Sequence, residues 1–182
     1  MRNWTQLAAD GNAMQRNIGK AIDKAMRQSA AATQTHYKSS FRTGGYVGDG
    51  SKWTRRKNTD QGRATLVQSG DLRRSIIARN IGQHIIVSSD KPYAEIHNEG
   101  GIIVQIPTMR QRMYFSHLSN NAFASGNTGL GNMFARMSRA KKLTIPIPER
   151  QFMAISGDRI DLNLKNKIYT IFKKNLDTTI PP

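Results

Sequence analysis

The 182-residue sequence has no cysteine, few acidic residues and little apolar content, and each shortage excludes something. Without cysteine the chain has no disulfide framework, no cysteine-ligated zinc and no thiol nucleophile. The first residues lack the apolar segment of a signal peptide, and no apolar run approaches the ~20 residues needed to span a bilayer. With 37% hydrophobic residues and no internal repeat, we expect a single domain over residues 1–182, part of whose surface is buried only in an assembly.

Acidic residues are outnumbered by basic ones, since 28 Lys and Arg stand against 12 Asp and Glu, which gives a net charge of +16. A surplus of this size favours an acidic partner, which is a nucleic acid, an anionic membrane or an acidic protein. The alternative is that the basic side chains only keep the surface soluble.

Two amphipathic helices are predicted near the ends of the chain. The first covers Leu7 to Tyr37, where the apolar residues Met14, Ile18, Ile22 and Met26 recur at helical spacing, and Thr33 and Tyr37 are candidates to extend the pattern. The second begins at Ser156–Asp158 and turns Leu164, Ile168 and Phe172 to one side. Helices with one apolar face typically cover a sheet, and the first helix is also a candidate subunit interface.

The middle of the chain predicts a small sheet and two short helices. One short helix follows Ser69, its expected N-cap, and the other covers Tyr93–Asn98. Four apolar runs predict the strands of one mostly antiparallel sheet, namely Ser75–Asn80, Gln83–Ser88, Ile102–Ile106 and Leu143–Ile147. Gly100 and Gly101 separate a helix from a strand, so at least one of them is expected to have a positive φ.

A long segment, Thr108–Lys142, separates the last two predicted strands and contains six basic residues but no acid. Its middle, SNNAFASGNTGLGN, has the composition of a loop, and loops of this length are usually functional or disordered. We predict an inserted arm that contacts a neighbouring subunit or another protein; the alternative is a flap folded on its own domain. The candidate contact residues are Arg110, Arg112, Tyr114, Phe115, Arg136, Arg139, Lys141 and Lys142.

Four segments in a fixed order carry a family resemblance: GSKWTRRK, LVQSGDLRRSI, PYAEIHNEGG and IPERQF. Together they resemble the phage virion morphogenesis family, the tail-completion proteins of Mu-like phages. The resemblance implies an α+β fold and assembly as a ring at the head–tail junction of a virion. It also implies that ten motif residues support the fold rather than catalysis; they are Trp53, Ser69, Gly70, Leu72, Tyr93, His97, Gly100, Gly101, Arg150 and Phe152.

Three patterns were considered as sites of chemistry. Glu95, His97 and Glu99 alternate and would share one face of a strand, but the flanking Pro and Gly residues favour a helical turn that scatters them. The GNTGLGN segment lacks the Lys and Ser or Thr of a phosphate-binding loop. Basic residues around Trp53, in Lys52–Lys57, are suited to nucleic acid, although the resemblance favours Trp53 as a loop anchor. We therefore expect no enzyme activity, metal or cofactor.

Two functions remain after these exclusions. The first is a structural virion protein that forms a closed ring, most simply a hexamer, and contacts neck, portal-adaptor or tail-tube proteins, with possible contact to packaged DNA and none to a membrane. The second is a nucleic-acid-binding module in which Lys52–Arg79 and the acid-free segment grip phosphates. Salt-dependent DNA binding by a monomer favours the second function, and rings formed without DNA favour the first.

Overall fold

The computed structural model describes residues 3–54, 65–155 and 161–179, and it divides the chain into two units. Unit 1 consists of residues 1–99 and 149–182, and unit 2 consists of residues 100–148. Helices and antiparallel strands occur in both units, so the predicted α+β class is confirmed.

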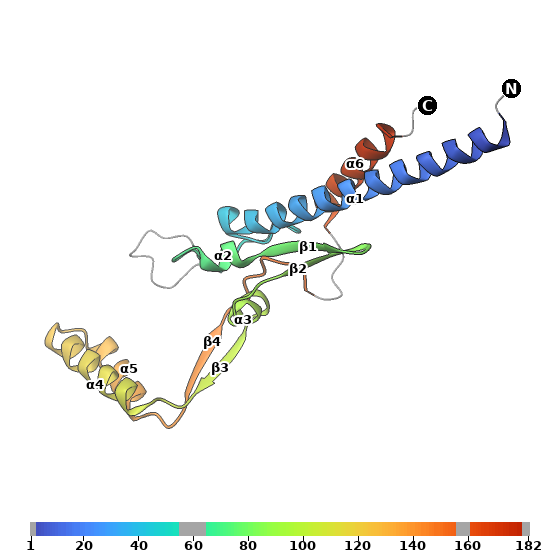
Figure 1. The fold of residues 1–182 in the computed structure, drawn as a ribbon. Helices are drawn as coiled ribbons and strands as arrows, with labels where there is room; N and C mark the ends of the chain where they lie inside the picture. Colours follow the sequence, from blue (N-terminus) through green and yellow to red (C-terminus); the bar gives the residue numbers. More distant parts are fainter. Residues whose placement is uncertain (1–2, 55–64, 156–160, 180–182) are drawn as a thin grey trace. The chain divides into compact units, whose positions relative to one another are not determined.

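A 40-residue helix, α1 (Trp4–Thr43), is the longest element of unit 1 (Figure 1). It begins at a capping box, in which Asn3 Oδ1 accepts from Gln6 N–H at 2.9 Å and Gln6 Oε1 accepts from Asn3 N–H at 3.2 Å. It ends at Gly44 in the left-handed conformation. The predicted helix is confirmed and is longer at both ends, because its caps lie outside the apolar repeat from which it was inferred.

The hairpin β1 (Ile77–Ile81) and β2 (His84–Ser88) lies along α1, and α6 (Leu162–Asp177) packs against α1 as well (Figure 1). The hairpin was predicted to within two residues at each strand end. Helix α6 begins at Leu162, with Asp161 as its N-cap. The predicted start at Ser156–Asp158 lies outside the described residues.

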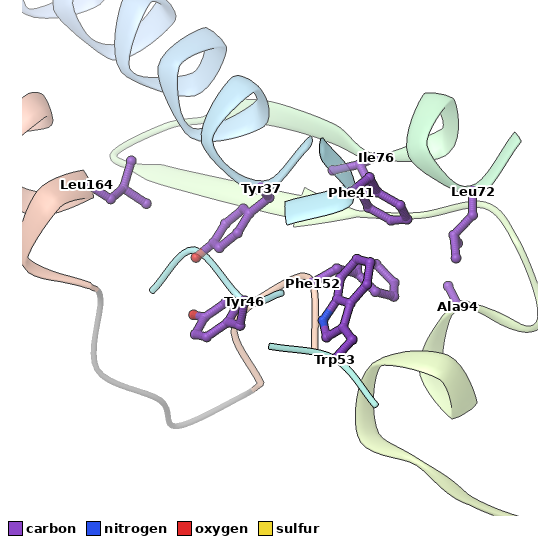
Figure 2. Close-up of a cluster of buried hydrophobic side chains, with 9 residues drawn as sticks. All are labelled: Tyr37, Phe41, Tyr46, Trp53, Leu72, Ile76, Ala94, Phe152 and Leu164. Carbon is purple, nitrogen blue, oxygen red and sulfur yellow. The ribbon is translucent and has the colours of Figure 1, made fainter. Parts of the chain in front are cut away.

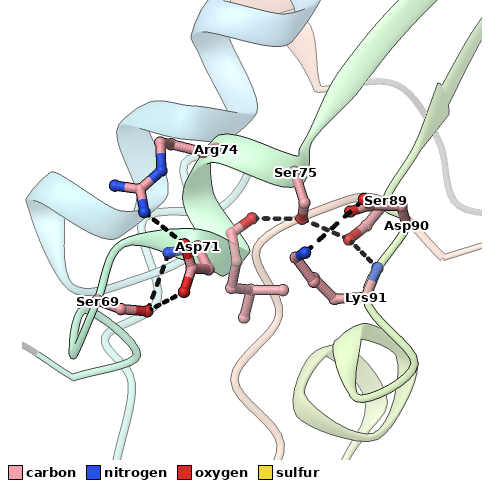
Figure 3. Close-up of polar contacts among 8 residues, drawn as sticks. Ser69, Asp71, Arg74, Ser75, Ser89, Asp90 and Lys91 are labelled. Atoms are coloured by element: carbon pink, nitrogen blue, oxygen red, sulfur yellow. Dashed lines mark hydrogen bonds and ion pairs between the residues drawn. The ribbon is translucent and has the colours of Figure 1, made fainter.

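Two short helices complete unit 1, namely α2 (Asp71–Ser75) and α3 (Ala94–Glu99). The N-cap predicted at Ser69 is wrong, because Gly70 takes the N-cap position with a φ of 76°. Ser69 Oγ instead accepts from Asp71 N–H at 3.3 Å and donates to the Asp71 carboxylate at 2.5 Å, while Arg74 also contacts that carboxylate (Figure 3). The glycine therefore shifts the cap by one residue and leaves the serine just outside the helix.

An aromatic core joins the elements of unit 1 (Figure 2). Phe41 from α1 packs against Trp53 at a ring distance of 5.5 Å and against Phe152 at 5.1 Å. The indole N–H of Trp53 donates to the Gln151 carbonyl at 2.7 Å. Segments that are about 100 residues apart in sequence therefore meet around three rings. The remaining core residues are Tyr37, Tyr46, Leu72, Ile76, Ala94 and Leu164.

Unit 2 contains a second two-stranded sheet and a pair of helices. Strands β3 (Gly101–Gln105) and β4 (Leu143–Ile147) pair antiparallel, with Ile103 opposite Ile145. Within the described residues, β1–β2 and β3–β4 are separate sheets, so the prediction of one four-stranded sheet is wrong. Only the pairing within each hairpin follows from the sequence pattern, because alternation of apolar residues does not specify a partner strand.

The segment between β3 and β4 forms a helical hairpin of α4 (Met109–Ala124) and α5 (Thr128–Arg139), so the loop predicted for its middle is wrong. Thr108 and Gln111 form a capping box at the start of α4, and Asn127 caps α5. A close approach at Gly131 joins the helices, since a Cβ there would lie 2.6 Å from the Phe123 ring. Ser119 Oγ donates to the Gly131 carbonyl at 2.8 Å.

Candidate interaction surfaces

The ten motif residues divide between the core and one pocket of unit 1. Trp53, Leu72 and Phe152 are buried in the aromatic core. Five others line a pocket of about 410 Å³, to which Leu72 also contributes; they are Ser69, Gly70, Tyr93, His97 and Arg150. The remaining two, Gly100 and Gly101, mark the entry to unit 2 with φ values of 73° and 149°, which confirms the predicted positive φ.

His97 lies in α3 at the edge of this pocket. Its carbonyl oxygen accepts from Arg150 N–H at 3.0 Å, while its buried Nδ1 has no hydrogen-bond partner among the described residues. Burial lowers the pKa of His97, and the positive charge of Arg150 lowers it further. The imidazole is therefore neutral at pH 7, and the residue joins the two motif segments through its main chain.

No group of three or more His, Asp or Glu side chains suited to a metal occurs in the part of the chain that the structure describes. Glu95, His97 and Glu99 lie on the helical turn of α3, as predicted, where side chains two residues apart do not share a face. Trp53 is buried and so offers no exposed ring on which a base could stack, while Lys52 Nζ donates to the Thr43 carbonyl at 3.0 Å. Arg55, Arg56 and Lys57 lie outside the described residues.

Two polar residues that the sequence analysis did not select hold unit 1 together. Asn98 Oδ1 accepts from the backbone N–H groups of Phe152 and Met153, each at 2.9 Å. His36 Nε2 lies 2.7 Å from Asp161 Oδ2, which links α1 to the start of α6. Burial lowers the pKa of His36, and Asp161 opposes this shift in part. The N-cap position of Asp161 was recognisable from sequence, but its pairing with His36 was not.

The candidate contact residues of unit 2 lie on the helical hairpin and on the chain that follows it. Arg112 differs from the others because its guanidinium donates to the Pro107 carbonyl at 3.3 Å and to the Ser138 carbonyl at 3.2 Å. Arg112 therefore stabilises the helical hairpin through these two bonds. The side chain of Phe115 is half-buried. The side chains of Arg110, Tyr114, Arg136, Arg139, Lys141 and Lys142 are exposed.

Unit 2 buries only two apolar side chains, Pro107 and Ala122, and has no core of large apolar side chains. No Ile, Leu, Val, Met, Phe or Tyr side chain in residues 100–148 is buried, and Ile102, Val104 and Met109 have 64%, 60% and 74% of their surface exposed. Both faces of the β3–β4 ribbon carry Ile or Val. A two-stranded ribbon is at best marginally stable in water, and exposed apolar patches of this kind mark interaction sites.

Comparison with known proteins gives one result. The sequence profile of the phage virion morphogenesis family matches residues 2–166 of the chain, which confirms the family inferred from the four motifs. The Mu-like subtype stays a prediction. No curated protein and no solved structure matches the chain. Among the described residues, no helix combines the length and the apolar character needed to cross a membrane.

Proposed function

Because the chain belongs to the phage virion morphogenesis family, we propose that this virion-assembly protein is a structural component of the head–tail junction, where its copies form a closed ring that completes or caps the tail. We expect no catalytic activity. The family resemblance favours six copies, and the ring would contact neck, portal-adaptor or tail-tube proteins.

The observation that carries this proposal is that unit 2 buries none of its large apolar side chains. Apolar side chains on both faces of the β3–β4 ribbon lose contact with water only when another surface covers them. The helical hairpin adds exposed Met113 and Tyr114 to the same unit. We expect such a segment to be stabilised by contacts within an assembly, because the interfaces of permanent complexes are apolar in the way that the core of a domain is.

The charge of unit 2 indicates the nature of the covering surface. Residues 100–148 contain six basic residues and no acidic residue, so copies of this unit repel one another. We propose that the hairpin contacts an acidic surface of another virion protein, since exposed Met and Tyr side chains beside Arg are typical of protein interfaces. Packaged DNA is the alternative partner.

Mass measurement of the purified full-length chain tests the ring, with and without added duplex DNA. We expect closed oligomers without DNA. A monomer whose DNA affinity falls steeply with rising salt would instead support the nucleic-acid-binding module.

Charge-removing variants test the hairpin surface. We expect Arg136→Gln, Arg139→Gln and Lys142→Gln together to reduce incorporation into particles, because the acidic partner loses its counter-charges. The matched control removes three exposed charges of unit 1 through Arg42→Gln, Arg73→Gln and Arg79→Gln. Equal incorporation of both triple variants would contradict the proposed surface.

A further inference from the structure

The apolar side chains on the N-terminal part of α1 are not covered by any other described element. Trp4, Leu7, Met14 and Ile18 recur at spacings of three, seven and four residues, which places them on one side of the helix. Trp4 has 87% of its surface exposed, and Leu7 and Met14 are also exposed. Further along α1, Ala21, Ala25 and Met26 are buried. The first turns of α1 therefore present an apolar stripe to solvent. We call the segment Asn3–Gln15, which carries most of this stripe, the α1 tip.

The α1 tip is already ordered as a helix. The capping box between Asn3 and Gln6 satisfies two backbone groups at its start. A preformed helix pays little conformational entropy when it binds, so an exposed apolar stripe on it is suited to a groove on another surface.

Unit 1 contains such a groove between α1, the β1–β2 hairpin and α6. Its volume is about 460 Å³, which is in the range of sites that hold whole ligands. Its apolar lining comes from all three elements: Met26, Tyr37, Ile85, Val87, Ile168 and Phe172. The groove is continuous with the core, since Tyr37 and Leu164 belong to both.

The tip of a chain cannot reach the groove of the same chain. Both lie on α1, and the 22 residues from Trp4 to Met26 separate them by about 33 Å along one unbroken helix. An apolar projection and an apolar groove at different places on one molecule form a heterologous contact, which closes into a ring when the rotation between copies allows it.

The α1 tip has no basic residue, whereas the helix that borders the groove is basic. The thirteen residues from Asn3 to Gln15 include Asp10 and no Lys or Arg, although Arg2 precedes them and Arg16 follows. Helix α6, which borders the groove, carries four lysines against one aspartate; they are Lys165, Lys167, Lys173 and Lys174. In a chain with a net charge of +16, contact through the stretch without basic residues avoids most of the repulsion between copies.

We propose that the α1 tip of one copy docks in the groove between α1, β1–β2 and α6 of the next copy, and that this contact links neighbouring subunits of the ring. This inference rests on the proposed function and adds to it the surfaces by which the copies join.

Cysteine crosslinking tests the contact on a background without native cysteine. One population of the full-length chain carries Leu7→Cys and the other carries Gln83→Cys at the groove margin. We expect a short bismaleimide to join the two populations when mixed, and to join neither population to itself. The matched control replaces Leu7→Cys with Ala9→Cys, which lies on the opposite side of the same helical turn and should give little product.

Mass measurement of tip variants provides the second readout. We expect Trp4→Ala and Leu7→Ala together to convert the oligomer to a monomer with an unchanged melting temperature, because neither side chain packs within its own subunit. Thr5→Ala should leave the oligomer intact. Crosslinking of Leu7→Cys to itself, or crosslinks only within a chain carrying both cysteines, would overturn the proposal.

Failure of this inference is distinguishable from failure of the ring. An intact oligomer in the Trp4→Ala, Leu7→Ala variant, with no crosslink in the mixed populations, leaves the ring in place but assigns its interface elsewhere. A native chain that is monomeric alone and present as one copy per particle would overturn both.

Discussion

The side-chain oxygen of Asn98 lies 2.9 Å from the backbone nitrogen of Phe152, although 54 residues separate the two in sequence. The same oxygen accepts from Met153 N–H, and the carbonyl of the neighbouring His97 accepts from Arg150 N–H. These bonds join the residues that precede unit 2 to those that follow it. Unit 1 therefore holds the two ends of the inserted segment together through its own contacts.

Asn98→Ala should reduce the free energy of unfolding by about 1–3 kcal/mol for each backbone N–H that it leaves unpaired and buried. Asn98 itself is buried, so water cannot replace the lost acceptor without rearrangement. Chemical denaturation of the purified variant measures the change. Glu99→Ala, at the exposed neighbouring position, is the control and should change stability by less than about 0.5 kcal/mol. A loss of equal size in both variants would show that Asn98 has no special role.

Replacing residues 106–142 with Asn-Gly should leave unit 1 folded, because β3 and β4 are adjacent antiparallel strands and Gln105 already faces Leu143. Circular dichroism and the fluorescence of buried Trp53 would report the fold. We expect particles that contain the shortened chain to fail to join heads to tails. Normal particle assembly would show that the helical hairpin is dispensable.

Gly100→Val should destabilise the chain by more than about 1 kcal/mol, since a branched side chain is strained at a φ of 73°. Thermal unfolding of the variant gives the measurement. The matched comparison is Gly100→Asn at the same position. A glycine within a helix, such as Gly19, would not serve, because its replacement changes helix propensity rather than strain at a positive φ. Asparagine tolerates the left-handed conformation better than valine, so it should recover part of the loss.

Stability should fall as the pH is lowered through 6.5. Burial lowers the pKa of both His36 and His97 in the folded chain, so below the ordinary value of 6.5 the unfolded chain binds more protons. Stability is thus lost on the acid side of pH 6.5 and retained above it. His97→Gln should reduce the slope of melting temperature against pH between 7 and 5, whereas His117→Gln, at an exposed position, should not. An unchanged slope in the His97 variant would contradict this assignment.

Local patterns in the sequence predicted local structure well. Alternating Ile and Val residues identified β1–β2, and the Pro and Gly residues around Tyr93 and Gly100 identified α3. The helical hairpin was not predicted, because its many Asn, Ser and Gly residues are typical of loops. Thr108 and Gln111 nevertheless carry the T-x-x-Q pattern of a capping box. That pattern by itself predicts the start of α4.

Long-range relations were not accessible in the same way. The strands form two separate sheets rather than one. The alternation of apolar residues in β3 and β4 shows that they are strands, but it does not specify which other strands they pair with. The pairs Asn98–Phe152 and His36–Asp161 join residues far apart in the sequence, and no spacing pattern links their members. Of the candidate contact residues, Arg112 was assigned to a surface but braces the hairpin, because guanidinium groups also bind carbonyl oxygens at helix ends.

The bonds that join Asn98 to Phe152 have a consequence for how such proteins diversify. With both ends of unit 2 anchored by main-chain and amide contacts of unit 1, the length and content of residues 101–147 are free to change without cost to the aromatic core. Insertions, deletions or whole replacements there would alter the exposed surface of unit 2 while the core of unit 1 stayed constant. Chimaeras that exchange residues 101–147 between related chains should therefore keep a folded unit 1.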